Sequence, residues 1–299
     1  MTTPTACHPP AEGAGQAGRC PCLVCNGNYA ACRIPGLVQC QNCGFVTADV
    51  RISDEELTTI YGEEYFHGKE YLDYAAEEES LRLNFRNRIA TLRSLVPRMA
   101  DAELFEIGCA YGFFLEEVAP SVRRAFGIDI STDAVRSARE RKGVEAEFGD
   151  YLKLKLPYQV DMITMWDTIE HLKHPELFVA KASRDLRYGG HLALTTGDIS
   201  SLNARLRGRH WRMIHPPTHL QYFSVATITK LLDRHGFDVI HVSHPGNSRK
   251  LRSILYAVLV LRMKWQAVYS TLQNLPLFNW PVTINLFDIM FVVARRRSW

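Results

Sequence analysis

The chain has 299 residues, of which 46% are hydrophobic and 22% charged, with a net charge of +3 and a pI near 8.4. Such a chain is long enough for one large globular domain and a small one, and its mild basicity gives no argument for a nucleic-acid partner. No apolar signal segment opens the sequence and no apolar run reaches the length of a membrane span. These absences exclude a secreted or membrane-spanning class, so we expect a cytoplasmic protein.

Residues 1–19 are rich in Thr, Pro, Ala and Gly, a composition typical of a disordered tail. A cysteine-rich module is predicted over residues 20–50, because cysteines that cluster in a chain without a secretion signal are typical of metal sites. Two pairs with two intervening residues have the spacing of a tetrahedral structural zinc site: Cys22 with Cys25, and Cys40 with Cys43. Cys20 is the alternative to Cys22, with a wider spacing.

Residues 51–100 are predicted to be a helical linker or lid. A short helix over 54–61 precedes an aromatic segment containing Tyr65 and Phe66, and a long amphipathic helix follows over 75–95. The aromatic segment is expected either to close over a ligand or to pack between the module and the core.

From residue 101 to the end we expect an α/β core, because apolar strands and helical patterns alternate from 104 to 196. The first strand carries Glu106 and enters a glycine-rich turn with Gly108 and Gly112, as a strand does at a nucleotide-type pocket. A tight turn that binds no ligand is the alternative for this motif taken alone. The residues at or just after the ends of the following strands lie at the sheet edge where ligands bind in such folds: Asp129, Ile130, Asp150, Tyr151, Trp166 and Asp167.

Two inserts interrupt this core. Residues 197–223 form a predicted irregular loop rich in Arg and His, beyond the carboxyl end of the fifth strand, where long loops are usually functional. Residues 243–286 separate the sixth strand from the seventh and include a predicted apolar helix over 251–272. This helix is expected to cap the core, to pair with another subunit, or to meet a lipid-like substrate or membrane surface.

The spacing of Glu106, Gly108 and Gly112 resembles motif I of class I S-adenosylmethionine (SAM) methyltransferases, with Ala110 at the usual middle glycine. The resemblance extends over residues 75–296. It implies a seven-stranded Rossmann-like sheet with a small zinc ribbon and helical caps, and SAM as cofactor with S-adenosylhomocysteine as product. It also implies that Asp129 binds the ribose and that Asp150 faces the adenine amino group, with Ile130, Tyr151, Trp166 and Asp167 beside them.

A second resemblance concerns the run Pro-Pro-Thr-His-Leu-Gln-Tyr-Phe-Ser, which includes His219 and Tyr222. It is similar to a signature of methyltransferases that act on sugars, quinones and related small molecules, with Thr218 where Glu is common. An alcohol acceptor must lose its proton near the transition state, and a histidine with a near-neutral pKa can take it. The predicted catalytic candidates are His171, His219, Tyr222 and His215.

The zinc module with the core also resembles sugar C-methyltransferases, which carry a further C-terminal domain that we do not expect here. O-methylation of a sugar, glycolipid or natural-product hydroxyl is therefore the leading interpretation. The predicted acceptor is a glycosylated or polyhydroxylated small molecule, with no nucleic-acid partner and with membrane-surface contact through 251–272. Alternatives are C-methylation of a nucleotide-linked ketosugar, an RNA or protein methyltransferase, and a non-catalytic SAM-binding subunit.

Overall fold

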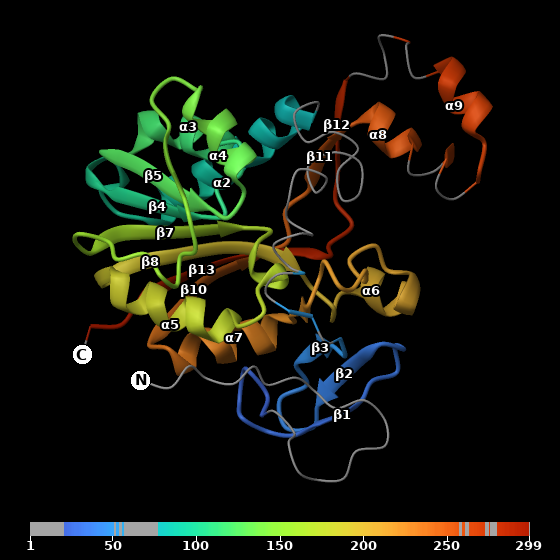
Figure 1. Cartoon of the computed structure of the whole chain (residues 1–299), viewed down its shortest axis with the longest axis horizontal. Coiled ribbons are helices and arrows are strands. Elements are labelled where there is room, and N and C mark those ends of the chain that lie inside the picture. The colour runs from blue at the N-terminus through green and yellow to red at the C-terminus, as the bar shows by residue number, and fades with distance from the viewer. Residues whose placement is uncertain are drawn as a thin grey trace.

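The computed structural model describes residues 21–50, 52–53, 56, 77–256, 259–260, 263–272, 275 and 280–298. Figure 1 shows a central sheet with helices on both faces, a small module near the N-terminus and a separate lobe that carries α8 and α9. The predicted tail, the short helix over 54–61 and the aromatic segment with Tyr65 and Phe66 lie outside the described residues.

The central sheet has seven strands in the order β10-β13-β8-β7-β4-β5-β6. Its five strands from β8 to β6 run parallel, and β13 is antiparallel to both of its neighbours. The predicted fold class is confirmed. The strands are β4 (Glu103–Ile107), β5 (Arg124–Asp129), β6 (Glu145–Phe148), β7 (Val160–Trp166), β8 (Leu186–Gly197), β10 (Phe237–Ser243) and β13 (Ile289–Arg296).

Helices α2, α3 and α4 lie on one face of the sheet, and α5 and α7 on the other (Figure 1). Successive residues of each strand enter opposite cores, because side chains alternate across a strand. On β13, Val292 packs in the core beneath α5 and α7 and Val293 in the core beneath α2 and α3. The helices are α2 (Glu78–Leu95), α3 (Phe113–Val118), α4 (Thr132–Arg139), α5 (Pro175–Asp185) and α7 (Val225–Arg234), with 3-10 turns η3 (Met99–Asp101), η4 (Ala119–Ser121) and η5 (Ile169–His171).

The N-terminal module is joined to the core through a shared sheet. Its strands β1 (Tyr29–Ala31), β2 (Leu37–Cys40) and β3 (Val46–Ala48) are followed in the sheet by β9 (Gln221–Tyr222), which comes from the first insert. The hydroxyl of Thr47 also donates to the carbonyl of Leu220 at 3.0 Å. The module with the predicted metal-binding cysteines and the segment around His219 are therefore joined through one sheet.

Three predictions about the inserts and their borders are wrong. The first insert is not an irregular loop, because it forms α6 (Leu202–Arg207), η6 (Gly208–His210) and β9. In the second, where one helix was predicted over 251–272, the described residues form α8 (Leu251–Leu255) and α9 (Gln266–Leu272). Lys264, with φ at 62°, takes the left-handed conformation just before α9, which a continuous helix does not allow.

The third difference is that β8 begins at Leu186, whereas the sequence pattern predicts that a helix over 175–186 is ended by Gly189 and Gly190, which instead lie within this strand. An unpredicted strand pair, β11 (Asn247–Lys250) with β12 (Pro281–Ile284), forms the base of the second lobe. Asn84 of α2 donates to the Asn247 side chain at 2.6 Å and accepts from the Ser248 amide at 2.7 Å. The lobe is thus attached to the helix that precedes the glycine-rich turn. Among the described residues, no helix combines the length and hydropathy that crossing a membrane requires.

Candidate functional site

The glycine-rich turn between β4 and α3 is held close to two neighbouring elements. Gly108 and Gly112 have φ angles of 77° and 73°, in the left-handed region that favours glycine. A Cβ on Gly108 would lie 2.7 Å from the Thr168 hydroxyl oxygen, and one on Gly112 would lie 2.9 Å from Val144. Ala110 also has a positive φ, 44°, at the position where motif I usually has its middle glycine. Packing and backbone conformation therefore both require the small residues at this turn.

Asp129 ties the end of β5 to this turn. Its carboxylate accepts from the backbone amides of Ala110 and Ser131, each at 2.9 Å. Burial raises the pKa of this carboxyl, and the amide hydrogen bonds act in the opposite direction. The carboxylate is therefore oriented at the sheet edge beside the loop, where the sequence placed a ribose ligand.

Glu106 lies at the base of the same turn and is 2% exposed. Burial, and secondly the Asp129 carboxylate, raise the pKa of Glu106 well above its usual value. Within the described part of the chain, its Oε2 atom has no hydrogen-bond partner. A buried carboxyl oxygen without a donor fits a ligand that brings hydrogen-bond donors or positive charge.

The other residues predicted at this edge divide into two groups. Ile130 is 48% exposed next to Asp129, and Asp150 accepts from the Leu152 amide at 2.9 Å at the start of a turn after β6. Tyr151 instead points into the core, where its hydroxyl donates to Asp185 at 2.8 Å. The structure therefore places Ile130 and Asp150 just after the ends of β5 and β6, and Tyr151 beneath α5.

Trp166 and Asp167 end β7 next to the turn. Trp166 packs with Phe114, at 5.0 Å between ring centroids, and the Arg88 guanidinium lies 5.0 Å from its ring. Asp167 has a φ of 49° and forms an ion pair with Arg88 at 3.2 Å. Trp166 is therefore a wall of the core, and Asp167 is held at the sheet edge by the buried arginine.

Three of the predicted histidines lie together beyond the carboxyl end of β7, where η5 carries His171. The His171 and His219 rings lie 4.5 Å apart between centroids, and those of His215 and His219 lie 3.8 Å apart. The segments that carry them are tied by a 2.9 Å hydrogen bond from the Leu220 amide to the Glu170 carbonyl. Tyr222 does not join the cluster through its hydroxyl, which donates to the His219 carbonyl at 2.9 Å.

Loss of solvent changes the protonation of this cluster. It lowers the pKa of His171 to about 4 and the pKa of His219 still further, with the neighbouring histidines as a smaller cause. Burial also lowers the pKa of His215. The imidazoles are therefore neutral at physiological pH, and none of the three has the near-neutral pKa that the sequence interpretation assumed.

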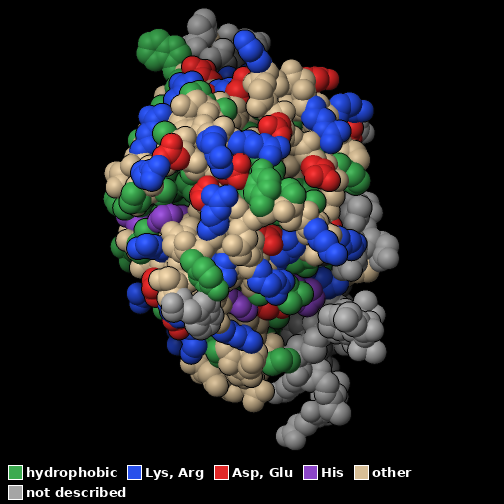
Figure 2. Space-filling view, turned by 90° about the vertical axis from the view of Figure 1, so that its left-hand side faces the viewer, with side chains coloured by type: hydrophobic (Ala, Val, Ile, Leu, Met, Phe, Trp, Pro, Cys, Tyr) green, Lys and Arg blue, Asp and Glu red, His purple; other side chains and the backbone are tan. Residues whose placement is uncertain are grey.

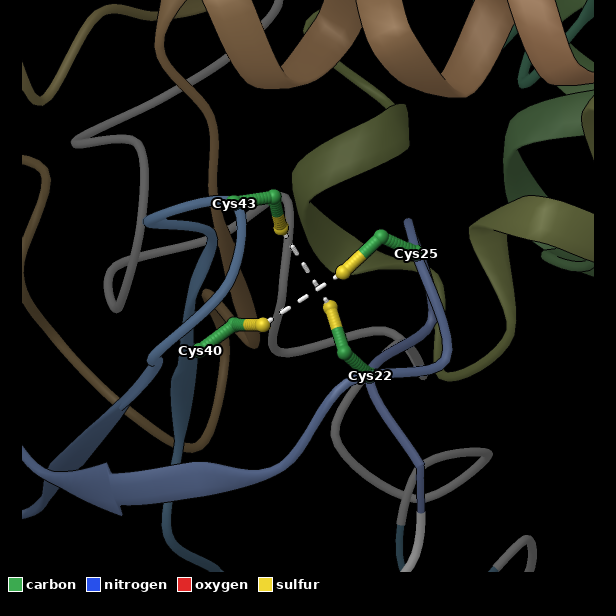
Figure 3. A group of neighbouring side chains, drawn as sticks. All are labelled: Cys22, Cys25, Cys40 and Cys43. Carbon is green, nitrogen blue, oxygen red and sulfur yellow. Dashed lines mark hydrogen bonds between the residues drawn. The ribbon is translucent and has the colours of Figure 1, made fainter.

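The four predicted cysteines of the N-terminal module converge (Figure 3). The Cys22 and Cys43 sulfurs lie 3.6 Å apart and those of Cys25 and Cys40 3.5 Å apart, with all four within 4.8 Å of one another. These separations exceed a disulfide bond and approach the edge of about 3.8 Å of a zinc–thiolate tetrahedron with bonds of about 2.3 Å. The donor set therefore fits a structural zinc ion. Cys22, and not the alternative Cys20, belongs to the four-sulfur group that the structure describes.

Comparisons with known proteins decide the family. The family model described as "Methyltransferase domain" matches residues 84–242, more than half of the chain. The chain belongs to this methyltransferase domain family. The match includes the glycine-rich turn, Asp129, the histidine cluster and β9.

Among curated relatives, a probable SAM-dependent methyltransferase from Mycolicibacterium smegmatis is 30% identical over 157 residues, covering 52% of this chain and 59% of the relative. A ubiquinone biosynthesis O-methyltransferase from Cupriavidus pinatubonensis is 31% identical over 123 residues, covering 39% of this chain and 47% of the relative. The chain thus spans about half the length of these relatives. The solved structure of the YcgJ protein from Bacillus subtilis has a TM-score of 0.53 at 16% identity, covering 72% of this chain and 100% of that one, and it shares the fold.

The methyltransferase residues at the glycine-rich turn fit SAM. Asp129 presents an oriented carboxylate suited to ribose hydroxyls, and the Glu106 oxygen that lacks a donor can accept a hydrogen bond from the ligand. Ile130 offers an exposed apolar side chain beside Asp129 for the adenine ring. Asp129, Glu106 and Ile130 thus offer the polar and apolar groups that such a ligand requires.

The sequence interpretation missed two buried charged residues that hold neighbouring segments in place. Arg88 is 8% exposed and forms an ion pair with Asp167. The one sequence feature that could have indicated its role is its position on the apolar face of the helix that contains Phe85 and Leu92. Asp288 is 2% exposed and accepts from Asn203, Trp211 and Arg212, so it anchors the first insert. No local pattern marked Asp288, because its partners come from a distant segment.

Proposed function

We propose that this methyltransferase-family chain transfers a methyl group from SAM to a hydroxyl group of a sugar, glycolipid or natural-product acceptor. The observation that carries the proposal is a pair of features: the oriented Asp129 carboxylate at the glycine-rich turn, and a buried histidine cluster beyond the end of β7. The first feature supports a SAM site and the second a polar acceptor side. Relatives named as ubiquinone biosynthesis O-methyltransferases support oxygen as the methylated atom.

When bound, SAM supplies a methyl group made electrophilic by its sulfonium. The protein's contribution is mainly alignment, since holding reactants in line supplies a large part of the barrier reduction in such transfers. The turn at Gly108 and Asp129 fixes the donor side, and Thr168 connects this turn with η5, which carries His171. The two reacting sides are therefore positioned by adjacent residues of the chain.

The acceptor side combines polar and apolar features. Arg212 forms a forked pair with Asp288 at 2.7 and 2.9 Å, and this pair holds the segment that leads to His215 and His219. The second lobe adds exposed aromatic side chains, with Trp265 52% and Trp280 67% exposed. These features support an acceptor with hydroxyl groups and an apolar portion.

The surface supports a small-molecule acceptor over nucleic acid. Figure 2 shows one face of the molecule, on which Lys and Arg side chains are interspersed with Asp and Glu. Several charged side chains of the molecule are paired, as in the ion pairs between Arg86 and Glu117 and between Arg187 and Asp161. A nucleic-acid site is expected to gather unpaired basic residues on one face.

The test is an assay with methyl-labelled SAM and a panel of hydroxylated acceptors, each with and without an apolar substituent. We expect label in an oxygen-linked methyl group and equimolar S-adenosylhomocysteine.

His219→Ala should lower turnover roughly a hundredfold, the scale of a positioned group at the reacting proton, without changing affinity for S-adenosylhomocysteine. His244→Ala is the matched control, because His244 pairs with Asp198 outside the cluster. Label on carbon or nitrogen would contradict O-methylation.

A further inference from the structure

The histidine cluster also contains a carboxylate. Glu170 precedes His171 in η5, is 2% exposed, and lies beside His219, which is 4% exposed. One carboxylate oxygen of Glu170 and one ring nitrogen from each of the two histidines all lie within 4.8 Å of one another. Two imidazoles and a carboxylate converging from two chain segments are the donor set of many divalent-metal sites.

Hydrogen bonds to backbone carbonyls fix the tautomers of His171 and His219. The Nδ1 atom of His171 bonds the Thr218 carbonyl and that of His219 bonds the Met213 carbonyl, each at 2.9 Å. A carbonyl oxygen can only accept, so each Nδ1 carries the proton and each neutral ring has its lone pair at Nε2. Metal-binding histidines are commonly oriented in this way, by donating the other ring nitrogen to a backbone carbonyl.

The remaining histidine supports this arrangement. His215 Nδ1 bonds the Thr218 hydroxyl at 2.6 Å, and that hydroxyl donates to the His215 carbonyl at 2.9 Å. These bonds fix the peptide whose carbonyl holds His171. His215 is therefore a positioning residue, which keeps both ligand-bearing segments in place.

We propose that Glu170, His171 and His219 bind one divalent transition-metal ion, separate from the four-cysteine site. The described residues supply three ligands to this group, the number that catalytic zinc sites take from the protein, whereas a structural site of four thiolates is closed. Imidazole and carboxylate ligands favour zinc, iron, cobalt or nickel over calcium and magnesium. The metal site stands on the geometry of these three residues, whereas its role in methyl transfer rests on the proposed function.

In that role the ion binds the acceptor hydroxyl at its open position. The metal lowers the pKa of the bound hydroxyl. The O–H bond then breaks and its proton leaves to solvent. An oxygen lone pair forms the new bond to the methyl carbon, and the carbon–sulfur bond breaks with its electron pair going to sulfur.

The test begins with metal counting on the full chain as purified, with its four-cysteine site filled with zinc. After dialysis against cobalt(II), elemental analysis should find about two metal ions per chain in the wild type. Cobalt in the second site should show visible absorption without thiolate charge transfer, because its ligands are nitrogen and oxygen. A wild-type content of one ion, with no cobalt bound, would overturn the proposal.

Two variants assign the second ion. Glu170→Gln keeps the side-chain shape and His219→Gln removes one ligand nitrogen, and each should reduce the metal content from about two ions to one. His244→Gln should keep both ions, since its partner Asp198 lies outside the group. Thermal unfolding and S-adenosylhomocysteine binding check that each variant is folded. A folded Glu170→Gln that retains the nitrogen- and oxygen-ligated cobalt would overturn the assignment.

Metal removal separates the site from the proposed function. Treatment with a chelator that removes the second ion but leaves the thiolate-bound zinc should lower methyl transfer at least tenfold, and cobalt should restore it. If the ion binds but turnover does not change on its removal, the metal role in methyl transfer is wrong although the site exists. If no acceptor is methylated at any metal content, the proposed function fails while metal counting still tests the site.

Discussion

At the scale of single residues, the pocket depends on carboxylates whose surroundings are fixed by the backbone. Asp129 bonds two amides, one from the glycine-rich turn and one from the start of α4. Its role is therefore double, because it closes the turn and presents oxygen atoms at the sheet edge. Glu106 sits behind it as a buried carboxyl whose pKa burial raises well above its usual value.

Replacing Asp129 should weaken the cofactor site. In Asp129→Ala, affinity for S-adenosylhomocysteine should fall by roughly 1.5–3 kcal/mol, the scale of hydrogen bonds to a charged group. Calorimetry measures this loss. The control Asp133→Ala removes a carboxylate of the next helix that pairs with Arg136 on the surface, and it should leave affinity unchanged. Equal affinity of Asp129→Ala and the wild type would exclude the ribose role.

Buried histidines should make stability depend on pH. Burial lowers the pKa of His191, and the neighbouring Arg295 adds to this effect. The unfolded chain then binds more protons than the folded one below the ordinary histidine pKa of about 6.5, so stability is present above that pH and is lost as pH falls through the folded pKa. Thermal unfolding of His191→Gln should show a smaller drop in Tm between pH 7 and pH 5 than the wild type. An identical drop would show that His191 does not contribute.

At the scale of elements, the N-terminal module acts on the acceptor side through a strand. β3 pairs with β9, with Val46 opposite Tyr222 and Thr47 opposite Gln221. The Phe45 and Phe223 rings add a contact at 5.0 Å between centroids. Because His219 lies two residues before β9, the fold of the module and the position of this histidine are linked.

Loss of the thiolate zinc should therefore reduce turnover more than cofactor binding. Cys40→Ser should lose one zinc ion and lower the melting temperature, since structural zinc contributes directly to folding. Turnover should fall while S-adenosylhomocysteine affinity stays within twofold. Cys32→Ser, a cysteine outside the four-sulfur group, should retain the zinc. A Cys40→Ser protein with full zinc content and unchanged melting would contradict a four-cysteine site.

The second lobe has the composition of a surface that meets anionic lipid. From residue 243 to residue 287 the sequence contains five Lys or Arg residues and no Asp or Glu. Trp265, Trp280 and Phe287 are all at least half exposed there. Aromatic side chains combined with basic residues are typical of membrane-interface segments.

We expect the full chain to sediment with vesicles that contain anionic lipid and less with neutral vesicles. Trp265→Ser and Trp280→Ser should each weaken this binding roughly tenfold, since burying a large apolar side chain contributes roughly 1.5–3 kcal/mol. Tyr188→Ser is the control, because Tyr188 is 58% exposed on β8, outside the lobe. Equal binding to both kinds of vesicle, or no effect of either tryptophan, would contradict this interpretation of the lobe.

At the scale of the whole molecule, local sequence patterns were sufficient to predict the strands of the central sheet. Features that depend on contacts between distant segments could not be predicted in this way. Strands such as β4 and β7 could be predicted because their apolar runs end at glycine or polar residues. β9 could not, because a two-residue strand exists only through its pairing with β3. The orientation of Tyr151 and the low pKa of His219 depend in the same way on packing against distant segments.

The most direct test of the account is calorimetric titration of the full chain with S-adenosylhomocysteine. The glycine-rich turn, the bonded Asp129 and the Glu106 oxygen without a donor predict one saturable site per chain, whatever the acceptor proves to be. Binding at a stoichiometry of one, weakened in Asp129→Ala, is the predicted result. A folded wild-type chain that shows no saturable binding of S-adenosylhomocysteine or SAM would contradict the central claim.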